Sequence, residues 1–391
     1  MKALKWFGRA TLAALTLAGL ASCGHVSLQT PARPDSTATP APVASVSPAA
    51  DELAATPTLL RGKSKWVAAP WSELPGFEAD ALFEAWNAFL KSCERPGPTF
   101  APLCSEIRRL SLGDAATQRA WLQDRLQPYR VEALQDIGTD GLLTAYFEPE
   151  IEARRLPDPV FAVPLYQPPV GLKPGKAWFS RRDIDTLPEP QTALRGREIV
   201  YLADPVQAMM LQIQGSGRIR VTEPDGAQRL VRLAYAGHNG QPYQSIGRWL
   251  IDQGELRDAS WPGIHAWITQ HPQQLTELLW RNPRVVFFRE EALGDFDAGF
   301  GPRGAQGVPL TPGRSIAVDP DSIPYGTPVW LASKGNSITL ERLVLAQDTG
   351  SAITGALRAD YFVGWGAQAG ELAGRLKQSL RLWVLWPKSP R

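Results

Sequence analysis

The sequence has few of the residues that metal and thiol chemistry require. Its 391 residues include only 4 His and 3 Cys, and the histidines have no ligand spacing among themselves or with Cys93 and Cys104. A zinc site needs three or four such ligands at characteristic spacings. We therefore expect no metal site, and nothing in the sequence indicates an organic cofactor.

Motifs for two common kinds of chemistry are also missing. No GxxxxGK[ST] phosphate loop is present, which argues against nucleotide chemistry. No G-x-S-x-G nucleophile elbow is present either, and Gly215-Ser216-Gly217 is expected to be a turn between two strands. Lys and Arg total 41 against 39 Asp and Glu, so the net charge of +2 gives no reason to expect a nucleic-acid partner.

Long apolar runs are missing beyond the N-terminus. There, Lys2, Lys5 and Arg9 precede a short apolar run, which predicts a signal peptide over residues 1–22 rather than a membrane span. The run ends in Leu20-Ala21-Ser22-Cys23, which is similar to a bacterial lipobox. We expect cleavage before Cys23, lipidation of its sulfur and, because Gly24 follows, anchoring on the periplasmic face of the outer membrane. An ordinary signal peptide with a chance cysteine is the alternative.

Residues 23–58 are rich in Pro, Ala, Ser and Thr, a composition that cannot bury enough apolar surface to fold. This stretch is therefore predicted to be a tether between the lipid and a folded body. Further on, Cys93 and Cys104 bracket a Pro-rich loop. In an oxidising compartment this pair can form a disulfide, and two buried thiols are an equally good interpretation.

Hydrophobic periodicity predicts a mainly β body with some helix. Apolar spacings of three and four predict helices at 78–93, 114–126, 271–282 and 370–380. Asp114 is the expected N-cap of the helix at 114–126. Short β-type runs are found at 141–153, 208–214, 217–223, 227–235, 283–290, 314–320, 327–333, 340–348 and 381–386. Pro224-Asp225-Gly226 predicts a hairpin. The length favours two domains, and the short C-terminal strands favour a small β-barrel over a doubly wound sheet.

Carboxylates are the remaining candidates for catalysis. Asp319, Asp348 and Asp360 follow small or apolar residues within about forty positions, although a lone aspartate of this kind is usually a turn residue. Asp360 differs because Tyr361, Phe362 and Trp365 follow it. An aspartate partly desolvated by aromatic rings has a raised pKa and can hold the proton that breaks a glycosidic bond. His238, before Asn239-Gly240, is expected to be a turn residue.

Several long motifs, in order, resemble those of the membrane-bound lytic murein transglycosylase A family of Gram-negative bacteria. The C-terminal region is similar to that family's three-aspartate domain in SIAVDPDSIPYGTPV, AQDTGSAITG and RADYFVGWG. The other matches are LLTAYFEPEIEA, LQIQGSGRIR, YAGHNGQPYQSIGRWLI and NPRVVFFRE, and the similarity runs from about residue 66 to residue 386.

The resemblance implies an α+β protein with a double-psi β-barrel, a second, smaller β-barrel inserted into it and a groove between them. The predicted catalytic domain consists of residues 59–149 and 304–391, with the three-aspartate region at 304–391. Residues 150–303 are the predicted substrate-binding insertion. The composition changes near Pro149 and strand character returns near Gly304, in agreement with this division.

The resemblance also implies a peptidoglycan lytic exotransglycosylase, a carbon–oxygen lyase acting without metal or cofactor. Asp360 would protonate the oxygen between N-acetylmuramic acid and N-acetylglucosamine. Its carboxylate would then take the proton of the muramyl C6 hydroxyl, which attacks C1 to form a 1,6-anhydro ring. An intramolecular nucleophile needs no second catalytic carboxylate. Either Asp348 or the dipoles of backbone and amides in the groove would stabilise the developing positive charge.

Substrate contacts are expected along the groove. If residues 208–214 form a strand, Gln212 and Gln214 share one face and can bond sugar hydroxyls and acetamido groups. Tyr146 is a candidate stacking platform, and weaker candidates are Thr144, Gly215, Ser216, Ser245 and Asp319. The expected partners are peptidoglycan strands, the outer membrane and complexes of cell-wall synthesis and hydrolysis. A hydrolytic muramidase and a non-catalytic peptidoglycan-binding lipoprotein are the alternative functions.

Overall fold

The computed structural model describes residues 57–134, 141–257, 259–295, 297–336 and 338–388. The predicted signal peptide, Cys23 and nearly all of the predicted tether lie outside these residues. Within the described ranges, no helix combines the length and the apolar character needed to cross a membrane.

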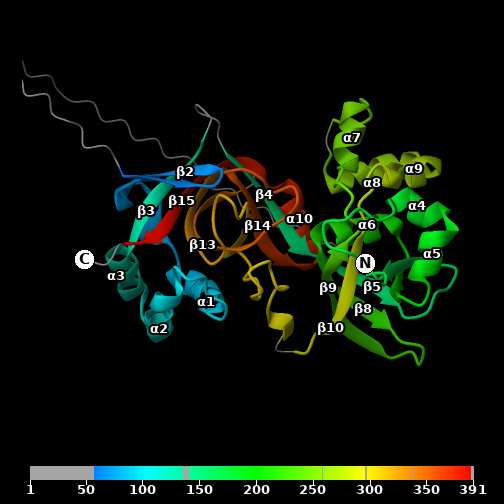
Figure 1. Cartoon of the computed structure of the whole chain (residues 1–391), viewed down its shortest axis with the longest axis horizontal. Coiled ribbons are helices and arrows are strands. Elements are labelled where there is room, and N and C mark those ends of the chain that lie inside the picture. The colour runs from blue at the N-terminus through cyan, green and yellow to red at the C-terminus, as the bar shows by residue number, and fades with distance from the viewer. Residues whose placement is uncertain (1–56, 135–140, 258, 296, 337, 389–391) are drawn as a thin grey trace, which may run out of the picture. The chain divides into compact units, whose positions relative to one another are not determined.

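The larger sheet of the described chain closes on itself. Its strand order is β1-β2-β3-β15-β12-β13-β11-β14-β4. In addition to its pairing with β14, β4 pairs with β15, so the last six strands of this order form a ring (Figure 1). The strands are β1 Thr58–Arg61, β2 Ser64–Ala68, β3 Leu126–Ala133, β4 Gly141–Glu148, β11 Ser315–Val318, β12 Pro328–Lys334, β13 Thr339–Asp348, β14 Arg358–Trp365 and β15 Lys377–Pro387. The pairs β11–β13 and β14–β4 are parallel and the others antiparallel. The prediction of a mixed α+β fold containing a β-barrel is confirmed.

The barrel strands are apolar on both faces because each face is covered. On β12, Val329 and Leu331 point into the barrel interior, where they pack with residues such as Val344 and Leu382. The alternating residues Trp330 and Ala332 point outward under a helical layer. This period-two division explains why these strands appear as continuous hydrophobic runs in the sequence.

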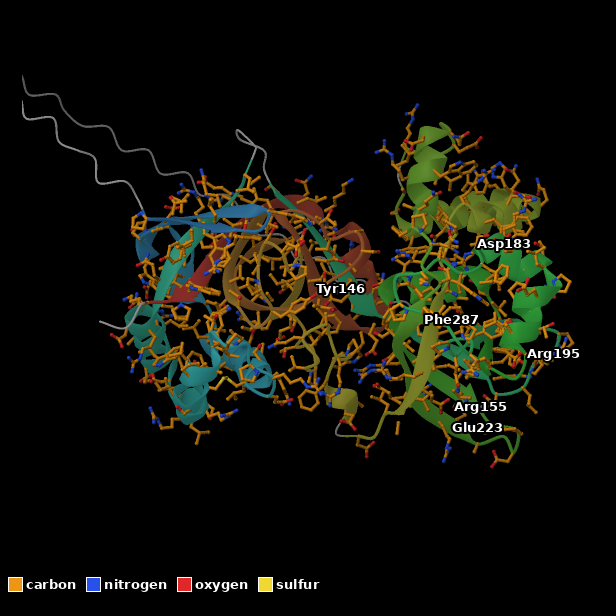
Figure 2. All side chains as sticks on the ribbon, in the orientation of Figure 1. Tyr146, Arg155, Asp183, Arg195, Glu223 and Phe287 are labelled. Atoms are coloured by element: carbon orange, nitrogen blue, oxygen red, sulfur yellow. A yellow bond between two sulfur atoms is a disulfide. The ribbon has the colours of Figure 1, made fainter. Side chains whose placement is uncertain are left out.

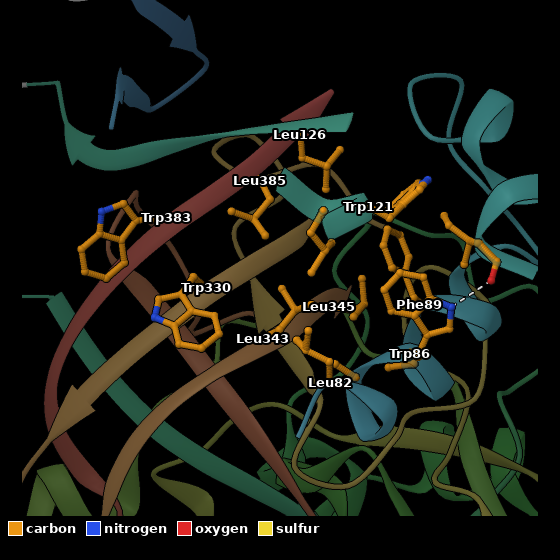
Figure 3. Packing of buried hydrophobic residues seen from close by; sticks show 14 of the residues in the cluster. Leu82, Trp86, Phe89, Trp121, Leu126, Trp330, Leu343, Leu345, Trp383 and Leu385 are labelled. Carbon is orange, nitrogen blue, oxygen red and sulfur yellow. Dashed lines mark hydrogen bonds between the residues drawn. The ribbon is translucent and has the colours of Figure 1, made fainter. Parts of the chain in front are cut away.

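A helical layer covers the outer face of the barrel. It consists of α1 Leu82–Ser92, α2 Cys104–Arg109 and α3 Ala115–Arg125. Trp86 and Phe89 of α1 pack toward Leu343 and Leu345 of β13, and the Trp86 indole donates to the Ile107 carbonyl over 2.8 Å (Figure 3). The predicted N-cap is confirmed, since the Asp114 carboxylate accepts from the Thr117 amide.

The loop between α1 and α2 is closed covalently. Cys93 directly follows α1, Cys104 begins α2, and the two sulfurs form a disulfide. Both residues are buried in the same apolar cluster as Trp86 and Phe100. Of the two interpretations that the sequence allows, the structure contains the disulfide.

The middle of the chain forms a second sheet in the order β10-β9-β8-β5-β7-β6. Its strands are β5 Glu150–Arg154, β6 Val163–Tyr166, β7 Glu198–Leu202, β8 Ser216–Thr222, β9 Gln228–His238 and β10 Val286–Ala292. The predicted hairpin joins β8 to β9, which pair antiparallel. The helices of this region are α4 Arg181–Thr186, α5 Pro188–Leu194, α6 Pro205–Gln214, α7 Ile246–Asp252, α8 Trp261–Gln270 and α9 Leu275–Trp280.

The run predicted at 141–153 is divided between β4 and β5, which belong to different sheets. Two other predicted elements differ from the structure in type or position. The run 208–214 lies in helix α6, not in a strand. The C-terminal helix α10 spans Gly366–Arg375 instead of 370–380, because residues from Lys377 onward already belong to β15 and pair with β4. In each case a local apolar run was compatible with either period, and tertiary pairing or capping decided between them.

A buried ion cluster lies where the chain passes from the barrel to the second sheet. Glu148 ends β4, is fully buried, and accepts from Arg218 of β8 over 2.9 Å and Arg232 of β9 over 2.6 Å. Both guanidinium groups also donate to the carbonyl of Phe300. A buried carboxylate is tolerated only when its charge and its lone pairs are matched in this way.

Candidate active site

Asp360 lies in the middle of β14, between two neighbouring strands of the barrel. It is opposite Thr144 of the parallel strand β4 and opposite Ala317 of the antiparallel strand β11. Its neighbours Ala359 and Tyr361 belong to the interior cluster. Because side chains alternate along a strand, Asp360 faces away from the barrel interior, on the same face as Arg358 and Phe362.

Asp348 reaches the same face from the other side of β11. It ends β13, and its register partner on β11 is again Ala317. Strands are spaced by roughly 4.8 Å, so the backbones of Asp348 and Asp360 are about 10 Å apart across β11. Two of the three predicted aspartates are thus brought together by barrel closure.

The carboxylate of Asp348 is held by three donors. Its Oδ1 accepts from the amides of Ala305 and Thr349, each over 2.9 Å, and its Oδ2 accepts from the Tyr146 hydroxyl over 2.9 Å. Burial and the negative charge of Asp360 raise the pKa of Asp348 to about 6, and the three hydrogen bonds oppose that rise. Three donors and no acceptor suit the ionised form, and a pKa of about 6 leaves Asp348 ionised at neutral pH.

Asp360 is held much less tightly. The structure records one hydrogen bond to its carboxylate within the described residues, from the Thr144 hydroxyl to Oδ1 over 2.5 Å. Burial raises the pKa of Asp360, while the Thr144 hydrogen bond and the positive charge of Arg358 oppose that rise. A carboxyl with a raised pKa and one oxygen without a recorded protein partner can both hold and transfer a proton.

Tyr146 contacts Asp348 and also packs against β14, the strand that carries Asp360. Its ring packs against Phe362 with centroids 5.3 Å apart, and its hydroxyl donates to Asp348. Burial first, and then the charge of Asp348, raise the pKa of Tyr146 well above its ordinary value. The hydroxyl therefore remains protonated and is always available as a donor. Figure 2 labels Tyr146 on its barrel strand.

Asp319, the third predicted aspartate, is turned toward the protein. It is 4% exposed, and its oxygens accept from the Gly355 amide over 2.7 Å, from Lys63 over 3.0 Å and from the Asp321 amide over 3.1 Å. Burial tends to raise its pKa, but the Gly355 amide and Lys63 outweigh burial and lower it. This geometry favours the anchoring of the loop 349–357 over the predicted substrate contact.

The prediction that Gln212 and Gln214 share the face of a strand is wrong. Both lie on helix α6, which begins with Asp204 capping the Val206 amide and ends at Gly215 with a left-handed φ of 82°. Residues two apart on a helix point in different directions. The Oε1 atom of Gln212 accepts from Arg181 over 2.7 Å, and that of Gln214 accepts from the Phe147 amide over 3.1 Å.

The weaker candidates have structural surroundings. Gly215 supplies the positive φ that ends α6, and Ser216 is 6% exposed at the start of β8. Ser245 is the N-cap of α7 and accepts from the Arg248 amide. His238 was expected to be a turn residue, but it is the last residue of β9 and accepts from the Gly240 amide of the following turn through Nδ1. Thr144 alone of this group contacts a candidate catalytic aspartate.

Sequence reasoning missed Arg358, Lys63 and the partners of Glu148. Arg358 precedes Asp360 by two positions and shares its face because both lie on β14, a strand that the sequence analysis did not predict. Lys63 contacts Asp319 across 256 positions, and no local pattern indicates such a contact. No cluster of three or more His, Cys, Asp or Glu side chains able to hold a metal exists in the described part of the chain.

Comparison with known proteins gives consistent matches. A family model described as the MltA specific insert domain matches residues 142–289, and one described as the 3D domain matches residues 314–386. The chain is 33% identical over 304 residues to the membrane-bound lytic murein transglycosylase A of Vibrio cholerae, which covers 73% of this chain and 76% of that protein. The Escherichia coli K12 relative of the same name is 34% identical over 275 residues, with coverages of 66% and 70%.

Solved structures match over most of the described body. MltA from Neisseria gonorrhoeae has a TM-score of 0.70 at 28% identity, covering 86% of this chain and 96% of that one. LtgG, a lytic transglycosylase of Burkholderia pseudomallei, is 40% identical with a TM-score of 0.56 and coverages of 86% and 98%. E. coli MltA with bound chitohexaose has a TM-score of 0.65 at 27% identity, with coverages of 80% and 91%.

Proposed function

Because the chain belongs to the membrane-bound lytic murein transglycosylase A family and is therefore a peptidoglycan-cleaving enzyme, we propose that Asp360 alone supplies its acid and its base. The bond cleaved is the β-1,4 bond between N-acetylmuramic acid and N-acetylglucosamine. The observation that carries the proposal is the difference between the two aspartates: three donors hold Asp348, and one holds Asp360.

The first step uses the raised pKa of Asp360. The protonated carboxyl gives its proton to the glycosidic oxygen as the bond from that oxygen to muramyl C1 breaks, which releases the N-acetylglucosamine hydroxyl. Positive charge develops at C1 and the ring oxygen. Asp348, held as a carboxylate by Tyr146 and two amides, stabilises that charge electrostatically.

The second step regenerates the acid. The muramyl C6 hydroxyl attacks C1, and its proton passes to the Asp360 carboxylate, so a 1,6-anhydro ring forms and no water is consumed. One group can serve both steps because the proton lost in the first is returned in the second. A hydrolytic enzyme would instead need a second carboxylate to activate water, and the three donors on Asp348 leave it poorly suited to that task.

Substrate contacts are proposed on the same face of the barrel as Asp348 and Asp360. The edge of the Tyr146 ring not covered by Phe362 is proposed to pack against a sugar ring. The Gln214 side chain, bonded to the Phe147 amide, connects α6 to β4 beside Tyr146 and is proposed to shape the substrate site. Ser216 and Gly215 follow it directly and would do so through backbone position.

The experiment combines product analysis with Asp360→Asn. Wild-type protein and variant are incubated with purified sacculi, and the soluble products are identified by mass spectrometry. The proposal predicts 1,6-anhydromuramyl ends from the wild type and a loss of turnover of at least about 10³-fold in Asp360→Asn. Reducing ends would establish a hydrolytic muramidase. Binding of sacculi without any cleavage would establish a binding lipoprotein.

The domain organisation is proposed as the sequence predicts it: residues 59–149 with 304–391 as the catalytic barrel, and 150–303 as the insertion. Of the six strands in the closed ring, β4 is at 141–148 and the other five lie within 315–387. The strands of the second sheet lie within 150–292, which supports these boundaries. Expression of 150–303 alone tests whether the insertion folds independently.

Anchoring is proposed through Cys23, on the periplasmic face of the outer membrane. Relatives are named as membrane-bound, and no described helix can span a membrane, so a lipid is the simplest anchor. A Cys23→Ala variant should lose incorporation of labelled fatty acid and leave the membrane fraction. Retention of the variant in the outer membrane would contradict the proposal. Association with cell-wall synthesis complexes stays a prediction.

A further inference from the structure

Arg358 and Asp360 lie two residues apart on one face of β14, and both contact the same hydroxyl. The Arg358 Nη2 group donates to Thr144 Oγ1 over 2.7 Å, and Thr144 Oγ1 donates to Asp360 Oδ1 over 2.5 Å. Arg358 is itself fixed by donating through Nη1 to the carbonyls of Leu142 and Ala359. The three side chains form a single directed chain from the guanidinium to the carboxyl.

The direction of this chain follows from the donors available. A guanidinium can only donate, whereas a hydroxyl has one hydrogen and two lone pairs. Arg358 therefore occupies one lone pair of Thr144, and in the structure the hydroxyl donates to Asp360 Oδ1. With the Thr144 hydrogen directed at Oδ1, the acidic proton of Asp360 is on Oδ2, because two hydrogens would otherwise meet along the contact.

We propose that Arg358 is a positioning residue that orients the Thr144 hydroxyl and so confines the transferable proton of Asp360 to Oδ2. The proposal rests on the function of Asp360 given above. In the first step Oδ2 releases its proton to the glycosidic oxygen. In the second step Oδ2 takes the C6 proton, while Oδ1 keeps the Thr144 hydrogen bond throughout. No hydrogen bond of the carboxyl has to rearrange between the two steps, which reduces the reorganisation that the reaction requires.

The charges around Asp360 support a second part of this role. On the β4 side, Thr144 and Tyr146 face Asp360. On the β11 side, its neighbour is the uncharged Ala317, and Asp348 lies beyond it on β13. Burial and Asp348 both disfavour a second negative charge here. Arg358 supplies the opposing positive charge, so it also stabilises the carboxylate that exists between the two steps.

The test measures kcat and KM on soluble glycan strands from about pH 4 to about pH 9. Arg358→Met should lower kcat roughly ten- to a hundredfold with little change in KM, because Arg358 orients the acid and does not bind the sugar. The alkaline limb of the profile should move to higher pH, since a positive charge that opposes protonation of Asp360 is lost. Arg358→Lys should keep the position of that limb, because the positive charge remains. It should not restore kcat, because an ammonium group lacks the planar arrangement of donors of a guanidinium.

A double-mutant cycle with Thr144→Val separates positioning from a general structural effect. If Arg358 acts through Thr144, the double variant loses no more activity than the worse single variant. Multiplicative losses would overturn the proposal, as would wild-type kcat and an unmoved alkaline limb in folded Arg358→Met. Should Arg358→Met fail to fold, Arg358→Lys combined with Thr144→Val provides the same cycle. Arg375→Met, on the exposed side of α10, is the matched control.

The function and the positioning role fail separately. If the wild type yields anhydro ends and Asp360→Asn is inactive, the function stands whatever Arg358 does. If Asp360→Asn retains turnover, the proposed function fails, and the role of Arg358 fails with it.

Discussion

Asp348 of β13 and Asp360 of β14 are register partners of the same residue, Ala317 of β11, from its two sides. Barrel closure thus holds two carboxylates on one face of three adjacent strands. Their surroundings differ, because three donors hold Asp348 and one holds Asp360. Neighbouring acids in unlike surroundings can take different roles, and we propose that Asp348 retains charge while Asp360 carries the proton.

Asp348→Asn should make the protein more stable and less active. Its pKa of about 6 lies above the ordinary 3.8, so ionisation weakens the fold as pH rises from below 3.8 to above 6. The cost is about 3 kcal/mol at pH 8 and is absent at low pH. Urea unfolding at both pH values should show the variant stabilised only at the higher one, while cleavage of sacculi falls at least about tenfold.

The control for that experiment is Asp124→Asn, an exposed aspartate of α3. It should leave the pH dependence of unfolding and the cleavage rate as in the wild type. Equal stabilisation of Asp348→Asn at both pH values would mean that the charge of Asp348 carries no cost in the folded protein. Full cleavage by the variant would remove Asp348 from the mechanism.

Tyr146→Phe should move the acidic limb of the pH–rate profile to higher pH. The hydroxyl donates to Asp348 and lowers its pKa, whereas the ring keeps its contact with Phe362 in the variant. Without the donor, Asp348 ionises at higher pH, and cleavage, which needs the charge of Asp348, therefore starts to rise at a higher pH. A hydrogen bond to a charged group contributes about 1.5–3 kcal/mol, so kcat near neutral pH should fall on the order of tenfold.

Tyr201→Phe on β7 of the second sheet serves as the matched change. It should leave both limbs of the profile where they are in the wild type. An unmoved acidic limb in Tyr146→Phe would show that Asp348 does not depend on this hydroxyl. A rise in KM alone would instead favour a pure stacking role for Tyr146.

Local sequence signals predicted much of the barrel. Apolar β-type runs predicted β11, β12, β13 and β15 but not β14, which carries Asp360. Asp114 caps α3, and the three aspartates were found together within about forty residues. The strand predicted at 208–214 failed because its apolar residues fit either period. The decisive signals are at its ends, where Asp204 and Pro205 begin a helix and the positive φ of Gly215 ends it.

The functions of individual polar residues depend on contacts that the sequence does not show. Asp319 and Asp360 have similar local surroundings in the sequence, yet Lys63 and Gly355 occupy the oxygens of Asp319 from two distant segments. Glu148 lies within a predicted strand, and only the structure pairs it with Arg218 and Arg232. Such pairings are set by strand register between segments far apart in sequence, which local patterns do not encode.

Asp319→Ala should loosen the loop 349–357 without unfolding the barrel. The side chain accepts from the Gly355 amide over 2.7 Å, and this contact holds the segment that leads into β14. Losing a buried, charge-assisted acceptor costs roughly 1.5–3 kcal/mol locally, so the Gly355 amide should exchange with solvent at least about tenfold faster. Hydrogen exchange measured by NMR or mass spectrometry checks this. Unchanged exchange at Gly355 would contradict an anchoring role.

Glu148→Met should be strongly destabilising, and further substitution should rescue it. The single change leaves Arg218 and Arg232 buried without their carboxylate, at a cost of about 3–5 kcal/mol in unfolding free energy. Replacing all three residues by Met removes the uncompensated charges, and the triple variant should regain most of that loss. Denaturant unfolding of wild type, single and triple variants measures both steps.

Activity of the triple variant then shows what the ion cluster does for the enzyme. Glu148 lies four residues after Thr144 on the same strand, and its register partner is Trp365, five residues after Asp360. Because the cluster fixes the ends of β4 and β14, a stable triple variant should cleave more slowly through a lower kcat. A triple variant with wild-type stability and wild-type kcat would show that the cluster positions neither strand. One that is no more stable than Glu148→Met would show that the two arginines are held chiefly by the Phe300 carbonyl.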